Sequence, residues 1–271
     1  MAAPKQKKPT MAEQADIHEL YEASVQSVEP EIEFLQATFR ALKQRDAKSF
    51  REDFCGTASV SCEWVRVGDD HYAIGVDIDA DVLDWGRRNR VAKLPETKRA
   101  RVQLLNDDVM AASTSPVDIV GAFNFSYWIF KTRPQLRSYF ERVRDTLVDD
   151  GVFFLDAYGG SEGYVEQKEK TKYDGFTYVW DQAKFEPVTA RTVCHIHFKF
   201  PDGSKLKRAF SYDWRLWTLP ELRELLEEAG FSKVAVYWEG EDDDGEGNGE
   251  FTEDARGEAD LAWIAYLVAQ K

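Results

Sequence analysis

The stretch Ser49-Phe50-Arg51-Glu52-Asp53-Phe54-Cys55-Gly56-Thr57-Ala58 decides the fold of this chain. Residues 49–54 are a candidate short strand, and Cys55-Gly56-Thr57 forms the turn that ends it. Residues 58–67 follow as a helix, and residues 71–77 as a second strand. A strand, a helix and a second strand in this order predict a βαβ unit, which belongs to a parallel sheet.

The same alternation continues along the chain. Helices are expected within 15–44 (a second one starting near Pro30), at 79–90 and 133–148, and after Thr218 as N-cap. Further strands are expected at 101–107, 117–125, 152–158, 232–240 and 259–270. This order predicts an α/β fold with a doubly wound, mostly parallel sheet.

Residues 175–213 break this alternation. Three segments there alternate polar and apolar side chains, and Pro201-Asp202-Gly203-Ser204 is a good hairpin turn between the last two. We therefore expect a small antiparallel layer inserted after the fifth strand. The very acidic segment between the last two strands shows no helical pattern and is expected to be a loop.

Polar side chains follow each of the first five strands. In an open α/β sheet, ligands bind at the carboxyl ends of the strands, so these side chains are candidates for a binding site. For Asp79 and Asp107, helix capping explains the residue equally well. The residues concerned are Glu52, Asp53, Asp77, Asp79, Asp107, Asp108, Asn124, Ser126, Tyr127, Asp156 and Tyr158.

The turn at 54–59 argues against a dinucleotide-binding site. Such a site needs three glycines so that the backbone can approach a pyrophosphate, and this turn has only Gly56. Acidic side chains at the strand ends would also repel a diphosphate. A ligand with a cationic centre, ribose hydroxyls and an adenine edge suits them better, and S-adenosylmethionine is such a ligand.

From about residue 45 to 270 the order of motifs resembles that of class I S-adenosylmethionine-dependent methyltransferases. Residues 52–58 are similar to their first motif, acid-x-Gly-x-Gly-x-Gly, with Phe54 and Ala58 replacing the first and last glycines. Residues 75–79 resemble the motif whose acid, here Asp77, holds the ribose. Residues 106–109 resemble the adenine-contacting motif, residues 118–126 the one that faces the methyl group, and residues 147–156 the fifth.

This resemblance implies a seven-stranded, Rossmann-like methyltransferase sheet and S-adenosylmethionine as the cofactor, leaving as S-adenosylhomocysteine. The cofactor residues that it implies are Glu52, Cys55, Gly56, Thr57, Ala58, Asp77, Ile78, Asp108, Val109, Asn124 and Phe125.

The antiparallel insert resembles that of small-molecule methyltransferases related to glycine N-methyltransferase, in which such a lobe and the N-terminal helices cover the active site. This implies lid helices at 13–48, and a methyltransferase domain at 49–270 with the substrate lobe at 170–215. The composition of residues 1–12, with Lys, Pro and Gln and no apolar run, predicts a mobile tail. Lid and substrate contacts are expected from Tyr21, Tyr127, Trp180 and Trp214. Packing within the lobe's own core also accounts for the tryptophans.

Methyl transfer from a sulfonium is an in-line displacement in which the protein mainly positions the partners and excludes water. The candidate catalytic side chains are Tyr127, Tyr158, Asn124 and His195, with the two tyrosines expected to orient the acceptor. Edge packing with a solvated hydroxyl is the alternative for both tyrosines.

Two patterns in the sequence could suggest metals, but we expect no metal. His195-x-His197 lacks a convincing third ligand nearby. The loop 242–253 nearly fits a calcium loop, but its flanks are strands and Gly249 takes the usual apolar position. We favour sheet-face packing or substrate contact for the histidines, and a solvated or lid-like acidic loop.

Composition and net charge argue against several classes of function. The 271 residues include 35 Lys and Arg against 49 Asp and Glu, a net charge of −14, which argues against nucleic-acid binding. Three cysteines form no disulfide framework and fit a reducing cytoplasm. We also expect no membrane span and no secretory signal.

These observations predict transfer of a methyl group from S-adenosylmethionine to a nitrogen or oxygen of a small-molecule acceptor. Methylation of a protein or peptide is one alternative, with the acidic 241–258 loop recruiting a basic partner. A non-catalytic scaffold that binds the cofactor is another, suggested by the glycines lost at 54 and 58.

Overall fold

A computed structural model describes residues 8–241 and 247–271, and the chain divides into two compact units. The antiparallel unit comprises the N-terminus up to Gln26 together with Tyr164–Leu216. The α/β unit comprises Ser27–Gly163 and Trp217–Lys271.

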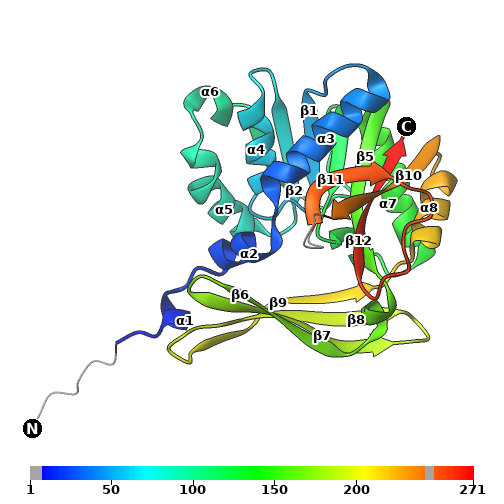
Figure 1. Cartoon of the computed structure of the whole chain (residues 1–271). Helices are drawn as coiled ribbons and strands as arrows, with labels where there is room; N and C mark the ends of the chain where they lie inside the picture. Colours follow the sequence, from blue (N-terminus) through cyan, green and yellow to red (C-terminus); the bar gives the residue numbers. More distant parts are fainter. Residues whose placement is uncertain (1–7, 242–246) are drawn as a thin grey trace, which may run out of the picture. The chain divides into compact units, whose positions relative to one another are not determined.

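The α/β unit is built on one sheet with eight described strands, of which the first five are mutually parallel (Figure 1). Three further strands extend it, each antiparallel to the strand before it in the sheet. Their order across the sheet is β3 (Val102–Asn106), β2 (Tyr72–Asp77), β1 (Ser49–Asp53), β4 (Val117–Ala122), β5 (Leu147–Gly159), β12 (Trp263–Gln270), β10 (Lys233–Glu241) and β11 (Gly247–Glu253). This confirms the doubly wound, mostly parallel sheet.

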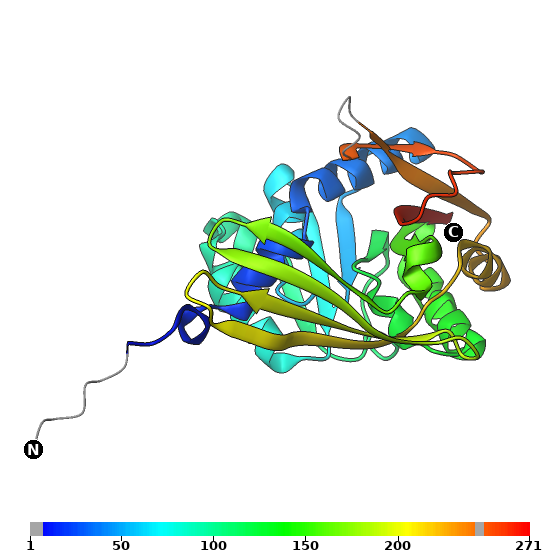
Figure 2. The same cartoon turned by 60° about the horizontal axis from the view of Figure 1, so that its bottom comes forward.

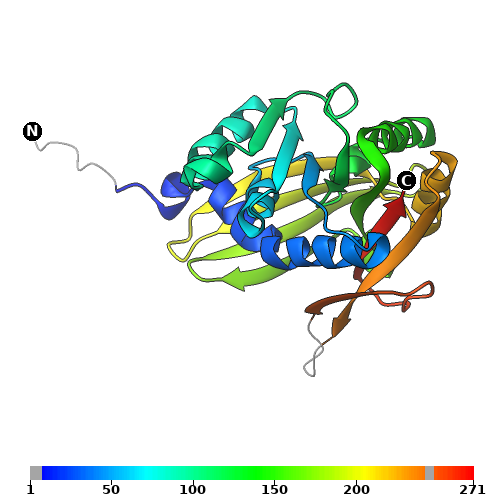
Figure 3. The same cartoon turned by 90° about the horizontal axis from the view of Figure 1, so that it is seen from above.

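Helices cover both faces of this sheet (Figure 3). The longer ones are α3 (Val28–Lys43), α4 (Ser59–Val67), α5 (Ala80–Asn89), α7 (Arg133–Thr146) and α8 (Leu219–Glu228). Short turns of helix are η1 (Val91–Lys93), α6 (Glu96–Arg99), η2 (Ser126–Ile129) and η3 (Ser161–Tyr164). Thr218 caps α8 as expected, in a capping box with Glu221.

Strand alternation assigns side chains to the two faces. On one face Phe50 lies 5.3 Å from Trp64 of α4, and Phe154 lies 5.7 Å from Phe34 of α3, measured between ring centroids. On the other face Phe153 packs against Phe140 of α7. Residues two positions along share these faces, so Glu52 and Asp156 lie on the α3–α4 side.

The antiparallel unit is a four-stranded sheet with two short helices (Figure 2). Its strands are β6 (Gln167–Tyr173), β7 (Phe176–Glu186), β8 (Arg191–Lys199) and β9 (Lys205–Arg215), and its helices are α1 (Met11–Gln14) and α2 (Ile17–Val25). The β8–β9 hairpin turns at 201–204, as predicted. Ile196 and Phe198 pack with Leu20 and Tyr21 of α2, so the helices share the core of this sheet.

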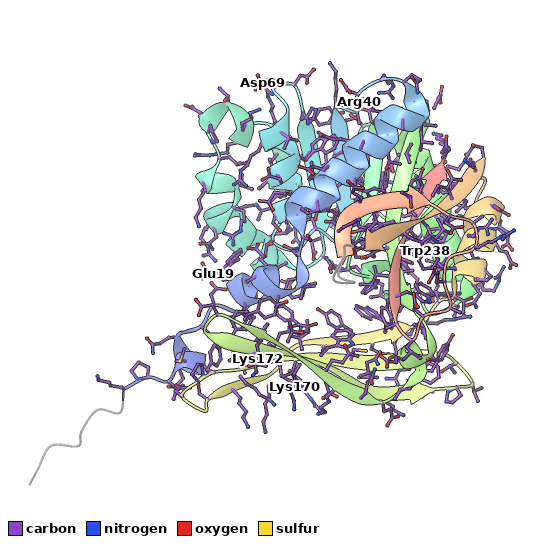
Figure 4. All side chains as sticks on the ribbon, in the orientation of Figure 1. Glu19, Arg40, Asp69, Lys170, Lys172 and Trp238 are labelled. Carbon is purple, nitrogen blue, oxygen red and sulfur yellow. The ribbon has the colours of Figure 1, made fainter. Side chains whose placement is uncertain are left out.

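Three elements differ from the sequence-based expectation. Residues 1–7 of the expected tail lie outside the described residues, but Met11 begins α1, capped by Thr10 and held by Asp202 at its backbone amide. Strand β6 was not expected because its Lys residues give no apolar alternation; Figure 4 labels Lys170 and Lys172 on it.

Strand β11 is the third difference, because it lies in the segment expected to be a loop. It makes the sheet eight-stranded where seven strands were expected. Its partner β10 supplies the main-chain pairing, and Phe251 supplies an apolar contact with the core, so pairing outweighs a glycine-rich, acidic sequence. The first residues of the suggested calcium loop, 242–246, lie outside the described residues.

Within the described ranges, no helix combines the length and the apolar character needed to cross a membrane.

Candidate functional site

The turn that follows β1 has positive φ at every second residue. The values are 58° at Phe54, 52° at Gly56 and 60° at Ala58. A Cβ atom makes this conformation unfavourable, which is why glycine is usual there. These are also the three positions at which the first methyltransferase motif has glycine. At these three positions the turn therefore adopts the backbone conformation that glycine tolerates best, although two of the glycines are replaced.

Gly56 lies at the centre of this turn and leaves room above the backbone. A Cβ atom placed on it would meet no heavy atom within 4 Å. Its amide nitrogen donates to Oδ2 of Asp77 at the end of β2, over 2.8 Å. A ligand can thus approach the main chain at Gly56.

Asp77 accepts from backbone amides on both of its oxygens, since Oδ1 also takes the Asp79 amide at 2.9 Å. Burial raises the pKa of this half-buried carboxyl, and the amide bonds oppose that effect. Each carboxylate oxygen has further lone pairs, so Asp77 can still accept ribose hydroxyls. Ile78 beside it is 73% exposed, so its apolar side chain is available to pack against a ring of a ligand. Asp79 itself caps α5.

Glu52 is 4% exposed and anchors the start of α4. Its Oε2 accepts from the Ser61 amide at 2.9 Å and from the Ser61 hydroxyl at 2.5 Å. Burial raises the pKa of Glu52 to about 8, and the two bonds from Ser61 oppose that effect. These contacts give Glu52 a helix-capping role. A direct contact with the cofactor stays a prediction.

The turn after β3 presents the residues expected near adenine. Asp108 is exposed, and its carboxylate accepts from the Met110 amide at 2.9 Å. Val109 is buried, and its carbonyl accepts from the Arg51 guanidinium at 3.2 Å. The Arg51 side chain thereby fixes the position of this turn from inside the sheet.

Arg51 and Asp53 form a buried ion pair behind the turn, with Nε and Oδ1 2.7 Å apart and side chains at most 1% exposed. The Tyr139 hydroxyl donates to the second oxygen of Asp53, at 2.9 Å. Sequence reasoning placed Asp53 at the strand end but did not identify its partners, which lie 2 and 86 residues away.

The end of β4 is a second strained turn, with φ of 54° at Asn124 and 58° at Phe125. The Asp156 carboxylate holds it, accepting from the Asn124 amide at 2.7 Å and the Phe125 amide at 2.9 Å. Burial raises the pKa of Asp156 to about 7 against these two bonds. Non-glycine residues in this conformation persist only where their neighbours hold them, and they are concentrated at functional sites.

Tyr127 is completely buried, and its hydroxyl donates to the Asp156 carbonyl at 2.7 Å. This bond connects η2 to β5, and a role of Tyr127 in orienting the acceptor stays a prediction. Tyr158 is half-buried beside Phe125, with ring centroids 4.8 Å apart, and lies 4.7 Å from Trp128. Phe125, Trp128 and Tyr158 thus form an aromatic group at the ends of β4 and β5.

The candidates in the antiparallel unit lie on two faces of its sheet. Trp180 and Trp214 pack with Tyr212, which lies directly opposite Cys194 in the strand register. His195 is the next residue along β8, so it lies on the other face, where its Nδ1 is 2.8 Å from the Ser211 hydroxyl. One small acceptor cannot contact both His195 and the tryptophans.

Tyr21 packs 4.8 Å from Phe210, and its lid role stays a prediction.

Glu31 of α3 and Tyr266 of β12 were not anticipated. The Tyr266 hydroxyl donates to Oε1 of the half-buried Glu31 at 2.9 Å. Burial and the nearby Asp156 raise the pKa of Glu31 to about 8. The only sequence signal was a glutamate in the first turn of an amphipathic helix, a position that usually indicates favourable interaction with the helix dipole.

Among the residues that the structure describes, neither the buried Cys55 nor the metal candidates add a reactive group to this site. Cys55 is buried, and burial raises the pKa of its thiol, which opposes a reactive thiolate. In residues 8–241 and 247–271, no three His, Cys, Asp or Glu side chains are grouped as a metal site.

No family model and no curated protein matches the chain. Solved structures do. A S-adenosylmethionine-dependent methyltransferase from Clostridium acetobutylicum has 13% sequence identity and a TM-score of 0.68, and 93% of this chain and 96% of that one are covered.

Two more matches are similar in extent. CalS10, an amino pentose methyltransferase from Micromonospora echinaspora solved with S-adenosylmethionine bound, has 15% identity, a TM-score of 0.66, and coverage of 94% of this chain and 97% of its own. KedS8, a sugar N-methyltransferase from Streptoalloteichus, has 16% identity, a TM-score of 0.62, and coverage of 100% and 98%. The chain therefore has the fold of S-adenosylmethionine-dependent methyltransferases over nearly its full length.

Proposed function

We propose that this chain transfers a methyl group from S-adenosylmethionine to an amine nitrogen of a small, polar acceptor of the amino-sugar class. The observation that carries the proposal is the turn after β1. Its positive φ values fall at the three glycine positions of the cofactor-binding motif, and its central glycine is open to a ligand. The fold shared with CalS10 and KedS8 supports the same activity.

The residues present fit this cofactor. Open space above Gly56 admits a ligand to the backbone, Asp77 offers lone pairs for the ribose hydroxyls, and Asp108 lies at the next strand end for the adenine. Bound there, the cofactor supplies an activated methyl group on a sulfonium leaving group. The acidic surroundings stabilise its positive charge, and the sheet holds it in a fixed orientation.

The side chains at the ends of β4 and β5 favour a nitrogen acceptor over an oxygen acceptor. Asp156 at the end of β5 and Glu31 in the first turn of α3 have raised pKa values, and Phe125, Trp128 and Tyr158 provide aromatic surface. Carboxylates stabilise an ammonium ion and oppose the oxyanion that a hydroxyl acceptor must form. The names printed for CalS10 and KedS8, an amino pentose and a sugar N-methyltransferase, agree with this preference.

We also place the protein in the cytoplasm and assign it a small-molecule partner. The three cysteines support a reducing compartment, because all are buried and none is joined in a disulfide. The net charge of −14 supports an uncharged or cationic partner over a nucleic acid.

The test is consumption of S-adenosylmethionine labelled in the methyl group, with four acceptor pools run in parallel. These are free and nucleotide-linked amino sugars, the corresponding hydroxy sugars, a denatured proteome, and buffer alone. We expect label in the amino-sugar pool. Label only in hydroxy sugars would contradict the nitrogen assignment, label only in protein would favour peptide methylation, and no label in any pool would favour a binding scaffold.

A further inference from the structure

Glu31 lies in the first turn of α3, which packs on the same face of the sheet as Asp156. The strand order runs from β3 and β2, whose ends carry Asp108 and Asp77, through β1 and β4 to β5 and β12. Glu31 is bonded to Tyr266 of β12, two strands beyond β4 and away from the ribose and adenine residues. If the cofactor binds at the carboxyl ends of β1, β2 and β3, Glu31 lies toward the ends of β4, β5 and β12, where the acceptor would bind.

Tyr266 and Asp156 connect Glu31 to the strained turn. They lie directly opposite each other in the β12–β5 register, so their side chains share the α3 face. Asp156 holds the Asn124 and Phe125 amides, and Tyr266 holds Glu31. One line of contacts thus runs from the end of β4 to the first turn of α3.

Glu31 differs from the other two acids in what remains available to a ligand. Asp156 and Glu52 are 5% and 4% exposed, and both oxygens of Asp156 accept backbone amides. Glu52 is bonded to Ser61 of α4. Glu31 is half-buried, and Tyr266 is bonded to one of its oxygens. Of the three residues, Glu31 is the most exposed.

The groups that face Glu31 are acidic or phenolic on every neighbouring strand. Asp156 from β5 and Glu52 from β1 raise its pKa, and the hydrogen bond from Tyr266 of β12 lowers it. Strand β10 adds Tyr237, packed on Phe34, and Glu239, whose charge acts on Tyr266. A cation bound among these groups would relieve their mutual repulsion.

We propose that Glu31, oriented by Tyr266, is the proton acceptor for the amine that this protein methylates. This rests on the proposed function. The acceptor enters as an ammonium ion and gives one N–H proton to the ionised Glu31 carboxylate. The freed nitrogen lone pair then forms the new N–C bond. The C–S bond breaks with its electron pair staying on sulfur, which becomes neutral, and the nitrogen becomes a methylated ammonium. The proton on Glu31 afterwards leaves to solvent.

The experiment compares Glu31→Gln and Tyr266→Phe with Glu33→Gln, an exposed glutamate on the same helix, using the best amine acceptor of the wild-type protein. We expect Glu31→Gln to lower kcat at pH 7 by about 10²- to 10⁴-fold, the usual worth of acid–base catalysis. Its rate should recover with rising pH as solvent supplies free amine. Tyr266→Phe should move the acidic limb of the kcat profile to higher pH, because the bond that favours ionised Glu31 is lost.

Calorimetry provides a readout that does not depend on turnover. Wild-type protein loaded with S-adenosylhomocysteine should release protons into the buffer when the amine binds at pH 7, because the ammonium ion drives ionisation of Glu31. Glu31→Gln should release fewer, while its affinity for S-adenosylhomocysteine changes less than about threefold. That retained affinity also shows that the variant is folded.

The outcomes separate this inference from the function on which it rests. Wild-type kcat and an unchanged pH profile in Glu31→Gln would overturn the role of Glu31 and leave amine methylation standing. A similar loss in Glu33→Gln would mean that the effect comes from helix charge. A wild-type protein that methylates hydroxyls or nothing at all would overturn both.

Discussion

The carboxyl edge of the sheet has two halves, one at the ends of β1, β2 and β3 and the other around the ends of β4 and β5, and both carry acidic side chains. At the ends of β1, β2 and β3, acids accept from nearby main-chain amides and hold turns in place, as Asp77 does at Gly56. In the other half, burial raises the pKa of Asp156 at the end of β5 to about 7, and that of Glu31, in the first turn of α3 beside Tyr266 of β12, to about 8. Both halves hold turns through carboxylates and contain a buried acid with a raised pKa, Glu52 in the first half and Asp156 in the second. The second half differs by adding Glu31, whose partner Tyr266 lies far away in the sequence.

The difference shows where function can be read locally and where it cannot. Asp77 and Gly56 are 21 residues apart within one βαβ unit, so spacing alone brings them together. Glu31 and Tyr266 are 235 residues apart and meet only because β12 inserts beside β5. Asp77 belongs to a local motif, whereas Glu31 acquires its chemistry from tertiary packing.

The largest effect is expected from Asp156→Ala, which tests whether the second half depends on this one carboxylate. The change removes both bonds that hold the Asn124 and Phe125 amides, and takes the carboxylate partner from these part-buried donors. The free energy of unfolding should fall by about 3 kcal/mol in urea titration. Asp149→Ala, at an exposed site on the same strand, should change it by less than about 0.5 kcal/mol. Equal effects from both variants would contradict the role of Asp156.

The next effect concerns the first half and is measured on binding. Asp77→Ala should weaken S-adenosylhomocysteine binding by about 1–3 kcal/mol in calorimetry, because it removes a partner of the ribose and releases the Gly56 amide. Asp81→Ala, at an exposed residue of α5, is the matched control and should leave affinity unchanged. Unchanged affinity in Asp77→Ala would contradict a contact between Asp77 and the ribose.

Much of the fold followed from the sequence because strands and helices of the α/β unit carry strong periodic patterns. The strand β6 did not, because a run such as Lys168-Glu169-Lys170-Thr171-Lys172 has no apolar face and is ordered by pairing with β7. The same limit applies to the site. Gly56 and Asp77 are placed by a local motif, but the burial of Tyr127 and the separation of His195 from Trp180 depend on which face each residue takes.

A third, intermediate effect appears in the pH dependence of stability. Burial raises the pKa of Glu52 to about 8 in the folded protein from an ordinary value of 4.5, so the folded state binds an extra proton between these pH values. Stability from this group is fully present below pH 4.5 and is lost as the pH rises through 8. Glu52→Gln should match wild type at pH 5 and exceed it by about 1–3 kcal/mol at pH 8 in urea unfolding. An unchanged slope would assign the pH dependence to Glu31 and Asp156 in the second half.

The smallest effect is expected from Ala58→Gly, and it asks whether the first half stores backbone strain. Ala58 has φ of 60° and is completely buried, so glycine relieves the conformation while removing only one methyl group. The gain from relieved strain exceeds the added chain entropy, and the free energy of unfolding should rise by about 0.5 kcal/mol. Ala73→Gly, at a buried alanine inside β2, should instead lower it by about 1 kcal/mol. If both substitutions destabilise equally, the turn carries no strain, and the missing glycines at 54 and 58 need another explanation.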